Sequence, residues 1–196
     1  MKNIIKDALI LFLITAAAGI LLAVVNEVTK KPIEEGKRAA VEAACKEVFP
    51  DADSFKAAEM PDDLADFEER YPKSCVDEIY DAYDAGGQNI GIVLNMTNKE
   101  GYGGNIRFSM GIALDGTLKG VAILETAETP GLGLQAADVL LPQFKDRKAD
   151  AFVFVKGGGA SAENEVDAIS SATITTRAFT NGINAGLDFF RTVLNR

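Results

Sequence analysis

The sequence predicts an α+β fold, in which a single N-terminal transmembrane helix precedes a domain with a mainly antiparallel sheet and flanking helices. Three observations lead to this prediction. Residues 8–25 carry no charge. Several short segments between residues 78 and 126 alternate apolar and polar side chains and are separated by turn sequences. Near the C-terminus, apolar residues recur at helical spacing. Because neighbouring strands follow one another without intervening helices, we expect a meander.

The N-terminal run, "ALILFLITAAAGILLAVV", is close to the ~20 residues that an α-helix needs to cross a bilayer. A cleaved signal peptide is the alternative, and "TAAAG" within the run would permit cleavage. The run is longer than a usual signal core, however, and "NEVTKKPIEEGKR" after it has no small-x-small site. We therefore expect a retained anchor in residues 1–30, with its span at 8–25, and a second domain in residues 31–196.

The basic residues around the span leave its orientation open. Lys2 and Lys6 precede it, and four basic residues follow it: Lys30, Lys31, Lys37 and Arg38. By the positive-inside rule this count would place the domain in the cytoplasm. The rule is weak here because two glutamates are interleaved with the basic residues and the N-terminal tail is very short.

The spacing of apolar residues and the positions of turn-forming residues predict further helices and strands. A helix is expected from Pro32 to about Phe49, and residues 60–75 are expected to be surface connection. Strands are expected at "EIYDAYD", "NIGIVLNMT", "NIRFSMGIAL" and "LKGVAILET", with a hairpin turn at "DGT". "AADVLLPQF" predicts a short helix, "AFVFVK" a further strand, and the apolar spacing after residue 178 a last helix that ends near Asn195.

Composition excludes several kinds of chemistry. Residues 1–38 carry a net charge of +2 and the remainder −11, so a nucleic acid partner is not expected. Without histidine there is no Ser-His-Asp or Cys-His catalytic site and no imidazole metal site. Two cysteines cannot hold a common iron–sulfur cluster within this chain. Cys45 and Cys75 could form a disulfide outside the cytoplasm or remain separate thiols.

Two glycine-rich segments are candidate loops. "KGGGA", residues 156–160, lacks both nucleotide-binding glycine patterns, so we expect a flexible hairpin turn there. In "ETPGLG", residues 128–133, Pro130-Gly131 predicts a tight turn and Gly133 a second non-standard backbone angle. Such a turn exposes backbone N–H groups and a threonine hydroxyl, although by itself it indicates only a loop between a strand and a helix.

The segment "DAISSATITT", residues 167–176, places many hydroxyls just before the last helix: Ser170, Ser171, Thr173, Thr175 and Thr176. Serine and threonine are favoured N-caps, but one cap needs only one hydroxyl. A helix N-terminus also favours a phosphate through its free N–H groups and macrodipole, and Arg177 could add a positive charge. The local chemistry therefore permits a phosphate here without requiring one.

The same segment resembles the flavinylation motif, commonly D-x-x-S-G-A-T-x-T, of FMN-binding domains in bacterial ion-pumping redox complexes. The order of anchor, "GYGG-I", "DG", "ETPGLG" and this motif resembles the G subunits of Rnf complexes, which are ferredoxin:NAD⁺ oxidoreductases coupled to ion transport. The C subunit of the Na⁺-translocating NADH:quinone reductase is a related but usually longer protein. The resemblance covers nearly the whole chain.

The resemblance implies that a flavin transferase joins the phosphate of FMN to the hydroxyl of Thr173 as a phosphoester. It implies recognition roles in the motif for Asp167, Ser170 and Ala172. It implies that the "ETPGLG" segment packs near the isoalloxazine ring, through Glu128, Thr129, Gly131, Leu132 and Gly133. Tyr102 and the glycines of "GYGG" are further, weaker candidates. The resemblance also implies that the flavin domain lies outside the cytoplasmic membrane.

One position departs from the motif, because Ser171 stands where the family usually has glycine. If that position requires a positive φ, serine is modestly strained there. Ser171 also offers a second hydroxyl, but the intact A-T-x-T register assigns the flavin to Thr173.

The resemblance thus implies an electron-transfer subunit that works with the other subunits of its membrane complex and catalyses no complete turnover alone. The alternative is a membrane-anchored extracytoplasmic binding or assembly module without a covalent cofactor, in which the hydroxyls only cap a helix.

Overall fold

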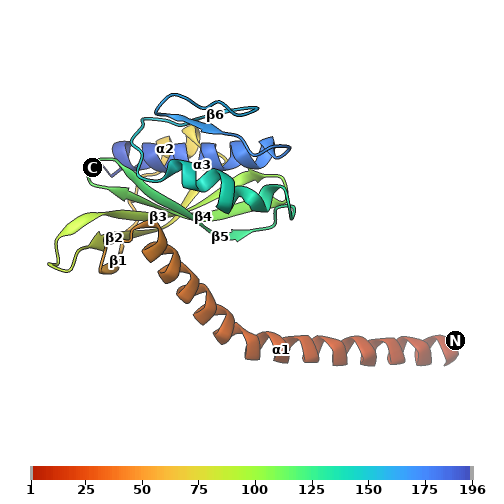
Figure 1. Cartoon of the computed structure of the whole chain (residues 1–196). Coiled ribbons are helices and arrows are strands. Elements are labelled where there is room, and N and C mark those ends of the chain that lie inside the picture. Colours follow the sequence, from red (N-terminus) through yellow and green to blue (C-terminus); the bar gives the residue numbers. More distant parts are fainter. Residues whose placement is uncertain (1, 195–196) are drawn as a thin grey trace. The chain divides into compact units, whose positions relative to one another are not determined.

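The computed structural model describes residues 2–194, which fall into two compact units, one up to Ala40 and one from Val41 onward (Figure 1). Helix α1, Lys2–Val48, contributes to both units and contains Pro32. The sequence predicted two separate helical segments here, whereas the structure has one continuous helix, because a single proline need not end a helix whose neighbouring residues remain helical.

The first unit is a helix whose apolar side chains are exposed. By length and composition α1 could cross a membrane, and its most apolar stretch is not buried against any part of the protein that the structure describes. Large apolar side chains lie exposed along it: Leu9, Leu11, Phe12, Leu13, Ile14, Ile20, Leu21 and Leu22. Exposure of this much apolar surface to water is unfavourable, so these properties support the predicted single membrane span.

The second unit contains a five-stranded antiparallel sheet with the strand order β1-β2-β3-β4-β5. Its strands are β1 Ser54–Ala58, β2 Ser74–Tyr83, β3 Asn89–Gly101, β4 Gly104–Ala113 and β5 Leu118–Thr126. The predicted meander is therefore confirmed. The sequence missed β1 and the short helix α2, Ala65–Arg70. Both are short and mostly exposed, so neither shows a clear apolar period.

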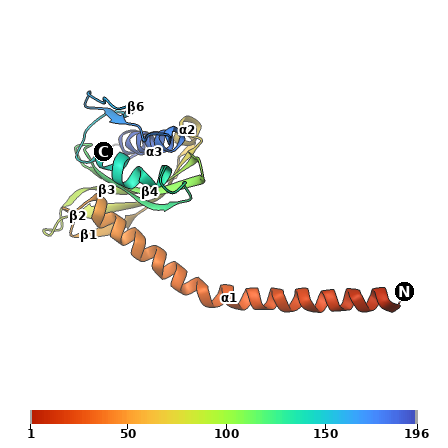
Figure 2. The same ribbon diagram turned by 45° about the vertical axis from the view of Figure 1, so that its right-hand side comes forward.

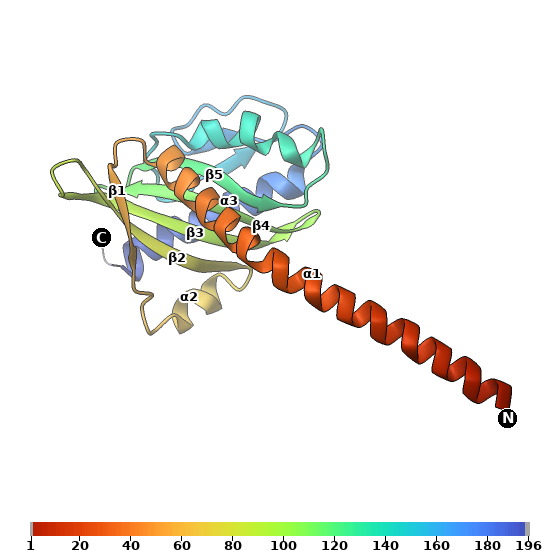
Figure 3. The same ribbon diagram turned by 90° about the horizontal axis from the view of Figure 1, so that it is seen from below.

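The central strands are buried on both faces of the sheet. Along β3, Ile92 and Leu94 face the main core, whereas Val93 between them belongs to a second apolar cluster on the opposite face. Helix α3, Thr173–Thr192, covers the main core. The turns of α1 after residue 40 cover the other face through Ala44, Cys45 and Val48 (Figure 3).

The segment after β5 forms three consecutive helical turns of irregular type. They are η1 Gly133–Gln135, η2 Ala136–Leu140 and η3 Leu141–Phe144, where the sequence predicted one short helix. Strands β6, Val153–Val155, and β7, Glu165–Asp167, then form a small parallel sheet. The predicted hairpin turn at residues 156–160 is therefore wrong, because a hairpin joins antiparallel strands. Figures 1 and 2 both show β6 on the side of α3 away from the large sheet.

The sequence also predicted where the last helix ends and left the pairing of the two cysteines open. Helix α3 ends at Thr192, and Asn195, where the sequence placed its end, lies outside the described residues. Cys45 and Cys75 are separate thiols. Burial raises the pKa of the Cys45 thiol to about 11, with nearby Glu78 and Glu42 adding to the effect.

Candidate functional site

A solvent-connected cavity of about 440 Å³ lies where three segments meet: the β3–β4 turn, the segment after β5 and the start of α3. The sequence-predicted residues that line it are Tyr102, Glu128, Thr129, Leu132, Gly133, Ser171, Ala172 and Thr173. Ile174 and Thr175 complete the lining. Its volume lies within the range of small-molecule sites. The fold thus brings together residues that are more than 70 positions apart in the sequence, for example Tyr102 and Thr175.

The "ETPGLG" segment forms the predicted tight turn. The Leu132 N–H donates to the Thr129 carbonyl at 3.2 Å, and Gly131 has φ 75°. A side chain is disfavoured at that φ, so glycine fits this position. Gly133 needs glycine for a different reason from the predicted backbone angle. A Cβ there would lie 2.4 Å from Oε2 of Glu128, so the requirement is for space.

Glu128 is the polar centre of the site and is only 5% exposed. Its Oε1 accepts a hydrogen bond from the Gly103 N–H at 3.2 Å. Its Oε2 accepts one from the Thr175 hydroxyl at 2.7 Å. A buried carboxylate is tolerated only with such partners. Glu128 therefore joins the β3–β4 turn and the first turn of α3 to the end of β5.

The hydroxyls of residues 170–176 fall into two groups. Thr175 is bonded to Glu128, and Thr176 donates to the Ala172 carbonyl at 3.0 Å and accepts from the Ile169 N–H at 3.1 Å. Within residues 2–194, the side chains of Thr173, Ser170 and Ser171 make no hydrogen bond to the protein. The cap position is held by Ala172, which has no capping side chain. None of these hydroxyls therefore caps the helix, which was the alternative interpretation of the segment.

Ser171 adopts φ 61°, in the left-handed region. Few residues with a side chain occupy this region, and glycine does so without strain. The positive φ that the sequence raised as a possibility at this position is confirmed, and the serine is exposed there.

Three predicted residues do not line this cavity: Asp167, Ser170 and Gly131. Gly131 shapes the turn, and Ser170 lies in a neighbouring hollow that also includes Ser171 and Thr173. Asp167, at the end of β7, accepts a hydrogen bond at Oδ1 from the Ala160 N–H at 2.9 Å. Its side chain therefore holds the glycine-rich loop that precedes it.

Three residues of the two hollows had no predicted role in the site: Ile174, Thr175 and Lys156. A signal for Thr175 was present, because it precedes Ala178 and Phe179 by three and four residues and so lies on the buried face of the helix. Nothing in the sequence indicates that Lys156 and Thr173 line the same hollow, since that arrangement depends on the pairing of β6 with β7.

Comparisons with known proteins agree with this arrangement. A model of the FMN-binding domain matches residues 101–188, and a model of the RnfG N-terminal region matches residues 1–48. The G subunit of the Na⁺-translocating ferredoxin:NAD⁺ oxidoreductase complex of Acetobacterium woodii is 33% identical over 193 residues, covering 97% of this chain and 93% of the relative. The chain belongs to the RnfG family. Another relative, the G subunit of the ion-translocating oxidoreductase complex of Methanosarcina acetivorans, is 30% identical over 196 residues, covering 96% of this chain and 95% of that protein.

A solved structure shows the same fold. The crystal structure of Shewanella oneidensis NqrC aligns with a TM-score of 0.58 at 23% identity, covering 83% of this chain and 95% of that one. The predicted membership of the RnfG family and the predicted fold are both confirmed. The match to the FMN-binding domain runs from the β3–β4 turn to the last turns of α3, so it includes every segment that lines the cavity.

The residues present fit FMN. Tyr102, Leu132 and Ile174 line the cavity with apolar side chains that are 40% exposed or more, which suits the face of a flat aromatic ring. The buried Glu128–Thr175 pair supplies a polar patch, and the unbonded Thr173 hydroxyl lies at the first residue of α3. The free N–H groups of that helix end favour a phosphate.

Proposed function

We propose that this protein is the electron-transfer subunit of a membrane-bound, ion-pumping ferredoxin:NAD⁺ oxidoreductase of the Rnf type, and that it carries FMN joined through its phosphate to Thr173. One observation supports Thr173 above all. Of the three threonines at the start of α3, Thr175 and Thr176 are bonded inside the protein, whereas Thr173 has no protein partner within the described residues. Among these three threonines, Thr173 is therefore the one whose hydroxyl is free for a covalent bond in the described residues.

The residues of the site position the cofactor, and the flavin supplies the redox chemistry. The exposed apolar side chains at the cavity would hold the ring of the flavin, and Glu128 holds the surrounding turns in place. A covalent tether keeps the ring at a high effective concentration near its redox partners. Electron relay needs no protein acid or base, which is consistent with a chain that lacks histidine. Alone, the subunit is expected to catalyse no complete turnover.

We further propose where the protein lies in the cell and which proteins it meets. The domain lies on the extracytoplasmic side, anchored by α1, and contacts the other subunits of the complex. A separate flavin transferase modifies it during maturation. In that step the donor would be a flavin dinucleotide: Oγ1 of Thr173 bonds to the phosphorus of its FMN half while the bond from that phosphorus to the second phosphate breaks, and the released nucleoside monophosphate carries away the proton of the hydroxyl.

The test is to express the full chain with and without a flavin transferase and to examine it on a denaturing gel. We expect flavin fluorescence to migrate with the chain only when the transferase is present, with a mass increase of one FMN less one water. Thr173→Ala should abolish the signal completely, and the control Ser171→Ala should retain it. Loss with Ser171→Ala alone would move the attachment to that residue. A dark wild-type chain would favour the module without a covalent cofactor.

A further inference from the structure

A second hollow of about 340 Å³ lies beside the start of α3 and shares Ser171 and Thr173 with the first cavity. Its lining is made up of the loop after β6 and the segment before α3: Lys156, Gly157, Gly158, Ala168, Ile169, Ser170, Ser171 and Thr173. We call it the glycine-loop hollow. Because Thr173 lines both spaces, a group attached to its hydroxyl can reach either of them.

The loop of the glycine-loop hollow is fixed at both ends. It begins at the end of β6, which pairs with β7. At its other end, the Ala160 N–H donates to the Asp167 carboxylate. Gln143 then holds the backbone of Asp167, accepting from its N–H at 2.7 Å and donating to its carbonyl at 3.1 Å. The loop is therefore attached to the same short strand that leads to Thr173.

The polar groups of the hollow suit an anion. Lys156 is exposed, and no carboxylate lies within ion-pairing distance of it in the part of the chain that the structure describes. This is notable because residues 39–196 carry a net charge of −11. The hydroxyls of Ser170 and Ser171 have no protein partner among the described residues. An ammonium group and two hydroxyl donors together match a group with several anionic oxygens.

We propose that the glycine-loop hollow is the subsite for the phosphate that links the flavin to Thr173, with Lys156 as its counter-charge. This inference rests on the proposed function, because the phosphate is the one carried by FMN. It gives the glycine-rich loop a binding role of its own. The isoalloxazine ring then occupies the first cavity, and the phosphate lies between the two spaces, beside the free N–H groups of α3.

The first test uses trypsin, which must take a lysine side chain into its own specificity pocket before it cleaves. We expect cleavage after Lys156 to be about fivefold slower in the flavin-loaded chain than in the chain from cells without transferase, the factor that an exposed ion pair of ~1 kcal/mol gives. Cleavage after Lys37 and Arg38, which are exposed on α1, should not change. Mass spectrometry of the fragments identifies each cut.

The second test measures the phosphorus resonance of the loaded chain by ³¹P NMR. Lys156→Gln should shift this resonance, because the phosphate loses its counter-charge. Lys145→Gln, which removes the same charge from an exposed lysine outside both hollows, should not.

The outcomes separate the two proposals. A fluorescent chain that is cut after Lys156 as fast as the chain without flavin, or whose ³¹P resonance is the same in Lys156→Gln, would overturn the subsite and leave the proposed function standing. A chain that acquires no covalent flavin would overturn both.

Discussion

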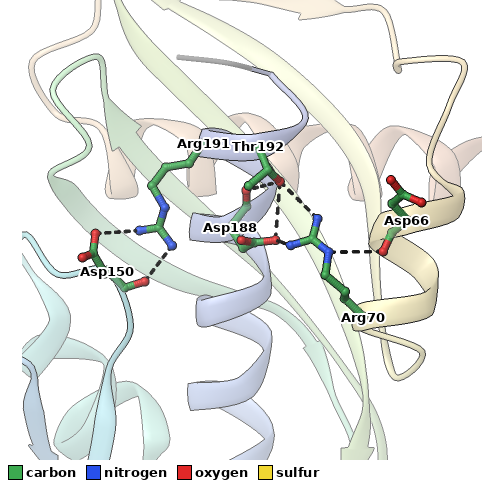
Figure 4. Close-up of polar contacts among 6 residues, drawn as sticks. All are labelled: Asp66, Arg70, Asp150, Asp188, Arg191 and Thr192. Carbon is green, nitrogen blue, oxygen red and sulfur yellow. Dashed lines mark hydrogen bonds and ion pairs between the residues drawn. The ribbon is translucent and has the colours of Figure 1, made fainter.

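The two ends of α3 differ in how they are held. At the C-terminal end, Arg70 of α2 pairs with Asp188 and donates to the Thr192 hydroxyl at 3.2 Å (Figure 4). On the other side of the helix, Arg191 donates to the carbonyl of Asp150 at 2.8 Å and lies 3.4 Å from its carboxylate. At the N-terminal end, by contrast, Ser170, Ser171 and Thr173 have hydroxyls without protein partners in the described region.

A helix that is held firmly at one end can present unbonded groups at the other end without losing its position. Apolar packing reinforces the C-terminal end, which we call the fastened end. There the rings of Phe67 and Phe189 meet edge to face, with their centroids 5.2 Å apart. The N-terminal end keeps a strained serine, and there the buried side chains of Thr175 and Thr176 hydrogen-bond within the protein. Because the rest of α3 fixes the helix axis, the first turn can leave the Thr173 hydroxyl without a protein partner in the described residues.

We expect the largest effect on stability from Gly133→Ala, which disrupts the Glu128 contacts at the N-terminal end of α3. The added Cβ would lie 2.4 Å from Oε2 of Glu128 and 2.9 Å from the Thr175 hydroxyl, so the carboxylate must move away from its partners. We expect a loss of about 1–3 kcal/mol in the free energy of unfolding, measured by denaturant titration. Flavin loading should fall as well.

Gly86→Ala is the control for this substitution, since Gly86 is exposed and its added Cβ would come no closer than 3.2 Å to any atom outside its own and the adjacent residues, the nearest being Oδ1 of Asp84. It should change stability by less than about 0.5 kcal/mol. If Gly133→Ala were as mild as this control, Glu128 would not be the fixed centre of the site.

A smaller effect is expected from Asp188→Asn at the fastened end. The Arg70 side chain is 42% exposed and that of Asp188 15%, so the lost ion pair should cost about 0.5–1 kcal/mol in the free energy of unfolding. Salt should reduce this difference, because it screens exposed charges. Asp66→Asn is the matched control, since Arg70 binds only the backbone carbonyl of Asp66. An effect of Asp188→Asn that is independent of salt would indicate lost packing in place of lost charge.

The sequence predicted most of the sheet because its strands alternate and its turns have strong local signals. At "DGT", for example, the Thr117 N–H donates to the Asp115 side chain and Gly116 has φ 85°. The parallel pairing of β6 with β7 could not be predicted in this way. Those strands have three residues each, and their direction is set by contacts with distant segments such as Gln143, not by their own sequence.

For the site, the motif in the sequence indicated which segments form it, but not which of their residues line the cavity and which hold the loops in place. "ETPGLG" and residues 171–173 do line one cavity. The motif did not show that Glu128 bonds to Thr175, or that Asp167 holds a glycine loop. The first contact joins residues 47 positions apart, and the second joins Asp167 to Ala160, 7 positions before it. Both depend on the completed fold.

The smallest expected effect is a gain in stability from Ser171→Gly. Serine at φ 61° is strained, and glycine adopts this angle freely, although it also makes the unfolded chain more flexible. The balance should raise the free energy of unfolding by about 0.5 kcal/mol, measured by the same titration. Ser170→Gly is the control, because Ser170 has no positive φ and glycine there only adds flexibility to the unfolded chain. A loss of stability with Ser171→Gly would mean that the serine makes a compensating contact. If Ser171→Gly raises stability and leaves covalent flavin loading unchanged, then flavin attachment does not require the backbone strain at Ser171.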